Sequence, residues 1–348
     1  MLAVILVFPC YGISAEKATV MDAQTGRILY EKNADQKSLI ASTTKIMTAL
    51  VVCEQCNVLD RMRIPKEAVG IEGSSMYLKE GEVLTIQELL YGLMLQSGND
   101  AAVALAIYCG GTVEGFAELM NDKARQLELK NTHFVNPNGL DAPEHYSTAS
   151  DLAVLAAYAM QNPVFSATVS AKTVRIGQRV LTNHNKLLWQ YPGADGIKTG
   201  YTKKAGRILV SSAKKDGRRL VAVTINAPSD WSDHKVLLDN GFEEYELKQI
   251  LTKGQILGHV QVAGGTAGYV ELIAAEDFVF PVGVDESPVI IFPEPGFVYA
   301  PVVSGMPAGK VYICVENTAL GSCTVVYGHT VEQVKQEKKS LWDKLFGS

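Results

Sequence analysis

The sequence predicts an α/β domain followed by a small all-β domain. Strand-like segments occur near the start of the chain and between residues 173 and 227, and a long helical stretch separates them. From about residue 252 the segments become glycine-punctuated and valine-rich, as in GHVQVAGGTAGYVELIAAEDFVFPVGV, with no helical period. The length of 348 residues also exceeds that of a typical single domain. We therefore expect two domains of different architecture.

Composition and charge narrow the class of protein. Hydrophobic residues make up 47% of the sequence, which is typical of a globular chain with a substantial core. The formal net charge of −5 argues against a nucleic-acid partner, because domains that bind polyanions are usually basic. No internal run reaches the length of about 18 apolar residues that a membrane-spanning helix needs.

Residues 1–15, MLAVILVFPCYGISA, resemble the later part of a secretory signal with cleavage near Ala15. The basic region that usually opens such a signal is missing, which suggests a truncated start. A buried first strand is the alternative, but Leu2–Phe8 shows no alternation of apolar and polar residues. We therefore expect export to the extracytoplasmic side of the membrane.

The cysteines do not indicate a disulfide framework. Removal of the signal would leave five of the six, an odd number; the six are Cys10, Cys53, Cys56, Cys109, Cys314 and Cys323. Cys53 and Cys56 form a lone CxxC without a second pair or zinc-spaced histidines, so we interpret them as core thiols. Cys314 and Cys323 could meet across a hairpin, which the sequence leaves open.

The first domain begins with strand signals and continues with helices. ATVMDAQTGRILYEKNAD predicts two strands around a Gln-Thr-Gly turn, and a helical stripe follows Ala41. Helical patterns cover about 85–96, 100–109, 112–127 and 148–161, with capping boxes at Thr85/Glu88 and Thr148/Asp151. RILVSSAKKDGRRLVAVTI predicts a hairpin that turns at Asp216-Gly217, and a helix follows at 232–245.

One pair of residues suggests nucleophilic chemistry. The pattern SxxK occurs five times, but only the match at Ser42 begins a long apolar-periodic helix. Side chains at i and i+3 share a helix face, so Ser42 Oγ and Lys45 Nζ could form a hydrogen bond. The positive potential of a helix N-terminus would lower the pKa of Lys45 and help it act as a base. The alternative is that Ser42 is only a helix N-cap.

Two further short segments carry polar groups that could face the same cleft. MLQSGNDAA places Ser97 and Asn99 in a glycine-containing turn between two apolar helices. GADGIKTGYT places Lys198, Thr199 and Gly200 at the start of a predicted strand, where Gly200 would allow a close approach to the backbone. A helix-ending turn and an exposed strand edge are the alternatives. In the order SxxK, SxN, KTG, the segments supply a base, a proton relay and an electrophilic clamp for acyl transfer.

The chain resembles the penicillin-binding D-alanyl-D-alanine carboxypeptidases. The similarity extends over MDAQTGRILYEKNAD, ASTTKIMTALV, GSSMYLKEGEVLTIQELLYGLMLQSGNDAA, NTHFVNPNGLDAPEHYST and DGIKTGYTKKAG. It covers about residues 15–245 and, more loosely, the β-rich part. The resemblance implies a penicillin-binding/β-lactamase-like domain, an antiparallel sheet with a helical cluster and Ser42 at their junction, followed by the small all-β domain.

The resemblance implies a serine-type mechanism. Ser42 would attack the carbonyl between the two terminal D-alanines of a peptidoglycan stem peptide, and Lys45 would take the Ser42 proton. Ser97, linked to Lys45 and Lys198, would relay a proton to the departing D-alanine. Water would then hydrolyse the acyl-enzyme, whereas penicillin, a β-lactam, would trap the same serine as a slow-clearing ester. No metal or organic cofactor is implied.

The resemblance also implies substrate contacts. Asn99 would hold a substrate amide carbonyl, and Thr199 with Lys198 would engage the terminal carboxylate. The backbone N–H groups of Ser42 and Tyr201 would form the oxyanion hole, in which one donor typically contributes about 3–4 kcal/mol of transition-state stabilisation.

Two departures from the family pattern concern the substrate side of the site. Many relatives carry histidine where Tyr201 stands. Some relatives also use a downstream arginine for the substrate carboxylate, but APSDWSDHK offers Trp231, Asp233 and His234 instead.

Other functions receive less support. A β-lactamase shares the three motifs and would need a carboxylate for deacylation, for which Glu144 is the candidate; a surface-loop glutamate is the alternative. D,D-endopeptidase and transpeptidase activities would use the same catalytic residues. A non-catalytic wall-binding or penicillin-sensing module is disfavoured by the intact motifs. GxSxG and HExxH are both absent, which argues against a Ser-His-Asp hydrolase and a zinc peptidase.

The domain limits follow from these patterns. We expect a signal at 1–15, the serine peptidase domain at 16–250, the β-rich domain at 251–332 and an amphipathic tail at 333–348. In the tail, Leu341, Trp342, Leu345 and Phe346 share one side beside three lysines, which suggests an anchor on the outer leaflet of the cytoplasmic membrane. A solvated terminal helix is the alternative.

Overall fold

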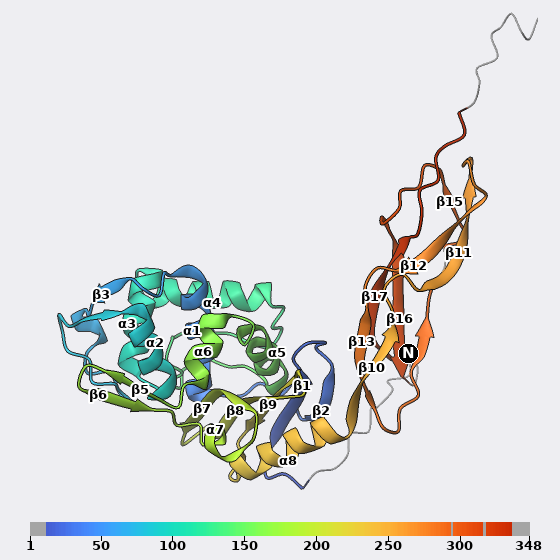
Figure 1. Ribbon diagram of the computed structural model, residues 1–348. Coiled ribbons are helices and arrows are strands. Elements are labelled where there is room, and N and C mark those ends of the chain that lie inside the picture. The colour runs from blue at the N-terminus through green and yellow to red at the C-terminus, as the bar shows by residue number, and fades with distance from the viewer. Residues whose placement is uncertain (1–11, 294, 316–317, 336–348) are drawn as a thin grey trace, which may run out of the picture. The chain divides into compact units, whose positions relative to one another are not determined.

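The computed structural model describes residues 12–293, 295–315 and 318–335. Most of the predicted signal and of the predicted amphipathic tail therefore lies outside the described residues. The chain divides into two compact units, and it passes from the first to the second between Tyr245 and Glu246. Each unit is described by itself (Figure 1).

A five-stranded antiparallel sheet forms the framework of the first unit. Its strand order is β2-β1-β9-β8-β7, so the first two strands of the chain pair with strands from residues 194–225. The strands are β1 (Lys17–Asp22), β2 (Ile28–Lys32), β7 (Ala194–Thr202), β8 (Gly206–Lys215) and β9 (Arg218–Ile225). This confirms the predicted central antiparallel sheet.

The described part of the first unit contains eight α-helices, which lie on both faces of this sheet (Figure 1). They are α1 (Lys45–Gln55), α2 (Ile86–Leu95), α3 (Asn99–Gly110), α4 (Val113–Gln126), α5 (Ala149–Ala159), α6 (Pro163–Ser170), α7 (Leu187–Gln190) and α8 (Asp230–Glu243). Side chains alternate across a strand, so Val221 and Val223 of β9 enter the core shared with the helical cluster. Leu220 and Ala222 pack on the other face with Leu237 and Leu238 of α8.

Local sequence signals account for several element ends. Thr85 and Glu88 form the full capping box predicted for α2. Thr148 accepts a bond from Asp151 N as expected, but the Asp151 carboxylate instead accepts from Asn131 N and Thr132 Oγ1, outside its own helix. The β8–β9 hairpin turns at Asp216-Gly217, where both residues have positive φ (51° and 82°).

Two short hairpins extend the helical cluster. One pairs β3 (Arg61–Arg63) with β4 (Val83–Thr85), and the other pairs β5 (Thr173–Ile176) with β6 (Arg179–Thr182). A 3-10 turn, η2 (Lys66–Ala68), lies between β3 and β4 in the sequence. The segment between η2 and β4 reaches the candidate site described below.

The first described residues are integrated into the first unit. The Asp233 carboxylate accepts hydrogen bonds from Ser14 N (3.0 Å), Ser14 Oγ (2.7 Å) and Ala15 N (3.0 Å). The side chain of Ala15 is fully buried, and Ala15 O accepts a bond from Lys32 Nζ at 2.7 Å. These contacts belong to the last two residues of the predicted signal, Ser14 and Ala15.

The second unit is β-rich. Its main sheet has the order β14-β16-β17-β12-β11-β15, and β10 pairs with β13 in a separate two-stranded sheet. The strands are β10 (Tyr245–Leu251), β11 (Ile256–Ala263), β12 (Tyr269–Ala274), β13 (Phe278–Gly283), β14 (Val289–Ile291), β15 (Phe297–Tyr299), β16 (Pro307–Val315) and β17 (Thr318–Tyr327). Val260, Val270 and Leu272 lie in its core. The predicted all-β architecture is confirmed.

The cysteines in the described residues are free thiols. Cys314 is opposite Ala319 and Cys323 is opposite Val311, so the register of β16 and β17 does not bring the two cysteines together. Cys53 and Cys56 pack against the helical core as partly buried residues.

In the described ranges, no individual helix combines the length and the apolar character needed to cross a membrane.

Candidate active site

A pocket of about 680 Å³ lies in the first unit, and it brings the three predicted motifs together. Ser42, Ser97 and Thr199 all line it, as do Gly200 and Tyr201. These residues come from three separate segments of the chain, so the pocket exists only in the folded domain.

Ser42 lies in a 3-10 turn, η1 (Ala41–Thr44), that runs directly into α1. Lys45 is the first residue of α1, and neither η1 nor α1 has a side-chain cap hydrogen bond. The alternative in which Ser42 is only an N-cap is therefore wrong. Ala41 has φ of 45°, a left-handed conformation that is strained for a residue with a side chain.

Lys45 is fully buried and its amine meets three oxygen atoms. Nζ lies 3.0 Å from Ser42 Oγ, 2.7 Å from Asn99 Oδ1 and 2.6 Å from the backbone oxygen of Asn138. Both carbonyl-type oxygens can only accept hydrogen bonds. When the amine is neutral, they engage its two N–H groups and leave its lone pair for the Ser42 hydroxyl.

The electrostatic environment favours that neutral form. Burial lowers the pKa of Lys45 well below its usual value, the positive charge of Lys198 lowers it further, and Asp100 opposes the shift. Burial also lowers the pKa of Lys198, to about 7. Lys198 Nζ donates to the backbone oxygen of Thr199 at 2.9 Å.

The segment around residues 136–145 holds the SxxK turn in place. Gly139 has φ of 86°, and a Cβ at this position would lie 1.9 Å from Ala41 O, so only glycine fits. Thr48 Oγ1 donates to Pro137 O at 2.6 Å. His145 Nδ1 accepts from Val135 N, so Nε2 carries the proton toward Thr44 Oγ1 at 2.8 Å.

The β7 strand passes the SxxK turn at very short range. A Cβ at Gly200 would lie 3.3 Å from Ile40 O, from Ser42 N and from Thr43 N. Gly200 therefore allows β7 to pass close to the turn that carries Ser42. The sequence predicted a close approach only between Gly200 and a bound molecule. The KTG residues lie within β7, several residues after its start at Ala194.

The SxN segment supplies one residue that binds Lys45 and one that faces the pocket. Asn99 begins α3, its Oδ1 accepts from Lys45, and its Nδ2 donates to Glu72 O at 2.6 Å, which leaves one N–H of the amide. Ser97 is buried with φ of 59° and lines the pocket. Among the hydrogen bonds of the described residues, none joins Ser97 Oγ to Lys45 or Lys198, so the expected link is not formed in this structure.

Glu144 lies outside the pocket. Its side chain is exposed, its backbone oxygen accepts a hydrogen bond from His133 Nδ1 at 2.6 Å, and it is not among the pocket-lining residues. Asp230 is the one carboxylate that lines the pocket in the described part of the chain. The surface-loop interpretation of Glu144 fits this position, and the β-lactamase hypothesis loses its candidate carboxylate.

The sequence reasoning missed Arg207. This residue of β8 is opposite Tyr201 of β7, and it lines the pocket with Asp230 and Trp231. Its Nη2 donates to Asp230 Oδ1 at 3.0 Å and Oδ2 at 2.9 Å. Arg207 is the eighth residue after Thr199, and the antiparallel pairing of β7 with β8 places it beside Tyr201. Its short distance in the sequence from KTG, across a predicted strand turn, was the signal that could have found it.

The described residues contain no group of three or more His, Cys, Asp or Glu side chains that could hold a metal ion.

Fold and site together define a serine enzyme of the acyl-transfer class, in which a buried lysine amine lies 3.0 Å from a serine hydroxyl. Residues 8–229 match the family model described as D-alanyl-D-alanine carboxypeptidase, and residues 245–333 match the penicillin-binding protein 5 C-terminal domain. The chain belongs to the D-alanyl-D-alanine carboxypeptidase family of serine peptidases.

Individual relatives agree with this assignment. The chain is 36% identical to the D-alanyl-D-alanine carboxypeptidase DacF of Bacillus subtilis, over 75% of this chain and 71% of that protein. It is 33% identical to the carboxypeptidase DacA of Haemophilus influenzae, over 96% and 89% of the two chains. The solved structure of penicillin binding protein 5 from Haemophilus influenzae is similar with a TM-score of 0.84 and 31% identity, over 94% of this chain and 100% of that one.

Proposed function

We propose that this chain removes the terminal D-alanine from peptidoglycan stem peptides that end in D-Ala-D-Ala, through an acyl-enzyme on Ser42. The observation that carries the proposal is the Lys45 amine, buried and 3.0 Å from Ser42 Oγ, with its other two neighbours restricted to accepting hydrogen bonds. Membership of the carboxypeptidase family supports the substrate class.

Acylation begins at Ser42. The neutral Lys45 amine takes the hydroxyl proton as Ser42 Oγ forms a bond to the carbonyl carbon of the penultimate D-alanine. The negative charge that develops on the carbonyl oxygen is stabilised by backbone N–H groups, for which we propose Ser42 and Tyr201. The C–N bond then breaks, and the departing amine of the last D-alanine receives a proton through Ser97.

The remaining pocket residues orient the substrate. Asn99 holds a substrate amide through its remaining N–H, while Lys198 and Thr199 engage the terminal carboxylate. Water then attacks the ester, Lys45 accepts the proton of that water, and Ser42 is regenerated. A β-lactam follows the same first step, but its opened ring stays attached to the ester carbonyl, so there is no leaving group to vacate the pocket.

The first test examines covalent chemistry at Ser42. Incubation with penicillin followed by peptide mass spectrometry is expected to locate a penicilloyl adduct on Ser42, and a D-Ala-D-Ala peptide is expected to release D-alanine. Ser42→Ala should abolish both, because the hydroxyl is the nucleophile. An adduct on another residue, or no D-alanine from the unmodified protein, would contradict the proposed function.

A second prediction concerns the pH dependence of kcat/KM. Activity rises with pH as Lys45 loses its proton, so the ascending limb reports the pKa of Lys45 in the free enzyme. Lys198→Gln removes a positive charge that lowers this pKa. The pKa of Lys45 should rise, and the ascending limb should move to higher pH, most clearly below pH 7 where Lys198 is charged in the unmodified protein.

The matched control for this experiment is Lys198→Arg, which keeps the charge and should leave the limb near its original position. Only the position of the limb is compared, so a general loss of rate does not obscure the result. A limb that stays in place or moves to lower pH in Lys198→Gln would show that Lys198 does not set the pKa of Lys45.

Arg207 is our candidate for a further contact to the terminal carboxylate. The guanidinium lines the same pocket as Thr199 and Tyr201, and its ion pair with Asp230 uses Nη2. Asp230 therefore orients the group while other N–H donors remain for a ligand. In this proposal the cation comes from β8, in place of the arginine that APSDWSDHK lacks.

Arg207→Ala should raise the KM for a D-Ala-D-Ala peptide by about tenfold to a hundredfold, since a hydrogen bond to a charged group contributes about 1.5–3 kcal/mol. The preference for a free carboxylate over a C-terminal amide should shrink in the same variant. Lys203→Ala, which removes a charge from the β7–β8 turn outside the pocket lining, is the matched control. An unchanged preference for the carboxylate in Arg207→Ala would refute this role.

We also propose an extracytoplasmic location, with the tail at 333–348 as a peripheral membrane anchor. Peptidoglycan lies outside the cytoplasmic membrane, so its processing requires export, and the tail combines Trp342 and Phe346 with neighbouring lysines. Deletion of 336–348 should move the protein from the membrane fraction to the soluble fraction while D-alanine release continues. Unchanged fractionation would remove the anchor from the proposal.

A further inference from the structure

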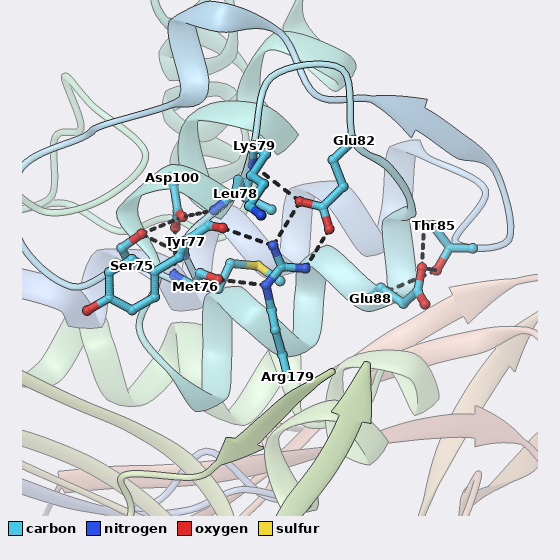
Figure 2. Close-up of polar contacts among 10 residues, drawn as sticks. All are labelled: Ser75, Met76, Tyr77, Leu78, Lys79, Glu82, Thr85, Glu88, Asp100 and Arg179. Carbon is cyan, nitrogen blue, oxygen red and sulfur yellow. Dashed lines mark hydrogen bonds and ion pairs between the residues drawn. The ribbon is translucent and has the colours of Figure 1, made fainter. Parts of the chain in front are cut away.

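Arg179 of β6 lies outside the pocket but connects two segments that line it. Its Nε donates to Met76 O at 2.9 Å and its Nη2 to Tyr77 O at 2.9 Å. The same guanidinium forms a two-pronged ion pair with Glu82, at 2.5 Å to Oε1 and 2.8 Å to Oε2. Figure 2 shows Arg179 pointing into the space between the Met76–Tyr77 backbone and Glu82. Its planar fork thus satisfies four acceptors at once.

The same stretch of backbone is held from the other side by Asp100. The carboxylate of Asp100 accepts from Ser75 Oγ (2.6 Å), Met76 N (3.1 Å) and Leu78 N (3.0 Å) (Figure 2). The N–H groups of residues 76 and 78 therefore face a negative charge, whereas the carbonyls of residues 76 and 77 face a positive one. Opposite charges from α3 and β6 together fix the conformation of the segment.

This segment continues into the contacts that hold Asn99. Ser74 O accepts from Asn99 N at 2.7 Å, and Glu72 O accepts from Asn99 Nδ2 at 2.6 Å. Gly73 has φ of 91°, and a Cβ there would lie 2.7 Å from Asn99 Nδ2, so the backbone lies directly against the amide. Asn99 Oδ1 in turn accepts from Lys45.

The strand that carries Arg179 also reaches the pocket lining. Ser74 lines the pocket from the segment that Arg179 holds. Thr182, the last residue of β6, lines it from the strand that carries Arg179, and Asn183 and His184 follow. One side chain therefore ties the Ser74 side of the pocket to the Thr182 side.

We propose that Arg179 is a positioning residue for the reaction at Ser42, which acts through residues 72–82 on Asn99 and so keeps the Lys45 amine aligned. The inference rests on the proposed function, because its consequence is measured at Ser42. Arg179 is not among the residues that line the pocket, so in this proposal it acts through other groups and not on the substrate itself. Its loss loosens the backbone that faces Asn99, and a small misplacement of a group that orients the base lowers the rate of the chemical step.

The competing explanation is that Arg179 only stabilises the fold. Met76 already anchors the segment in the core, because it is buried and a Cβ at Gly92 would lie 2.1 Å from its sulfur. The ion pair is partly exposed, with side-chain exposures of 23% for Arg179 and 22% for Glu82, and exposed pairs contribute little to stability. Four hydrogen bonds converge on a partly exposed guanidinium, which fits a role in positioning the backbone of residues 76 and 77 better than a role in stabilising the fold.

The experiment measures acylation of the full-length protein by a fluorescent penicillin at several concentrations. Arg179→Gln should lower the limiting first-order acylation rate by about tenfold, while the half-saturating concentration changes by less than about threefold. Arg179→Lys keeps the charge without the planar fork and should give an intermediate rate. Glu82→Gln, which leaves the two carbonyl contacts in place, should have a smaller effect.

Arg125→Gln is the matched control, because Arg125 is an exposed residue of α4 paired with Asp122. It should acylate at the unmodified rate. First-order rates do not depend on how much protein is folded, so reduced yield of a variant does not mimic the expected result. A limiting rate equal to that of the unmodified protein in Arg179→Gln, even with a lowered thermal stability, would overturn the proposal. Failure of the proposed function would instead appear as no Ser42 adduct in the unmodified protein.

Discussion

A fully buried lysine amine is the constraint on which the site depends. The Lys45 side chain is fully buried, and the free energy of placing a charge there is unfavourable, so the neutral form becomes accessible. Two fixed acceptors, Asn99 Oδ1 and Asn138 O, then decide where the lone pair of the amine points. Without both acceptors, a neutral amine could rotate away from Ser42.

Much of the surrounding structure serves to bring backbone close to this amine. Gly139 permits the 136–145 segment to reach Ala41, and Gly200 permits β7 to pass the same turn. Ala41 and Ser97 both adopt positive φ next to the reacting groups. Such conformations cost about 1–3 kcal/mol each and persist where the surrounding packing imposes them. The domain core around α1 supplies that packing.

The sequence predicted the parts of the site that depend on short spacing. Ser42 and Lys45 are three residues apart, and a helical or 3-10 turn brings such side chains together in either case. The sequence did not reveal Asn138, because its contact to Lys45 uses a backbone oxygen that any residue type possesses. Arg207 was missed because its position depends on the pairing of β7 with β8, and Arg179 because it acts on a segment about a hundred residues earlier. Whether Cys314 and Cys323 meet also depends on strand register, here that of β16 and β17, which the sequence does not reveal.

The strand order of the first unit has a consequence for how the domain folds. β1 pairs with β9, so helices α1 to α7 all lie, in the sequence, between two strands that are neighbours in the sheet. Closing such a long intervening segment has a high entropic cost, and proteins rich in distant contacts fold slowly. The helices can collapse around α1 first, but β7, which flanks the serine turn, becomes part of the sheet only through β8 and β9. A chain that emerges N-terminus first therefore acquires its reactive centre late, after nearly the whole domain has become available.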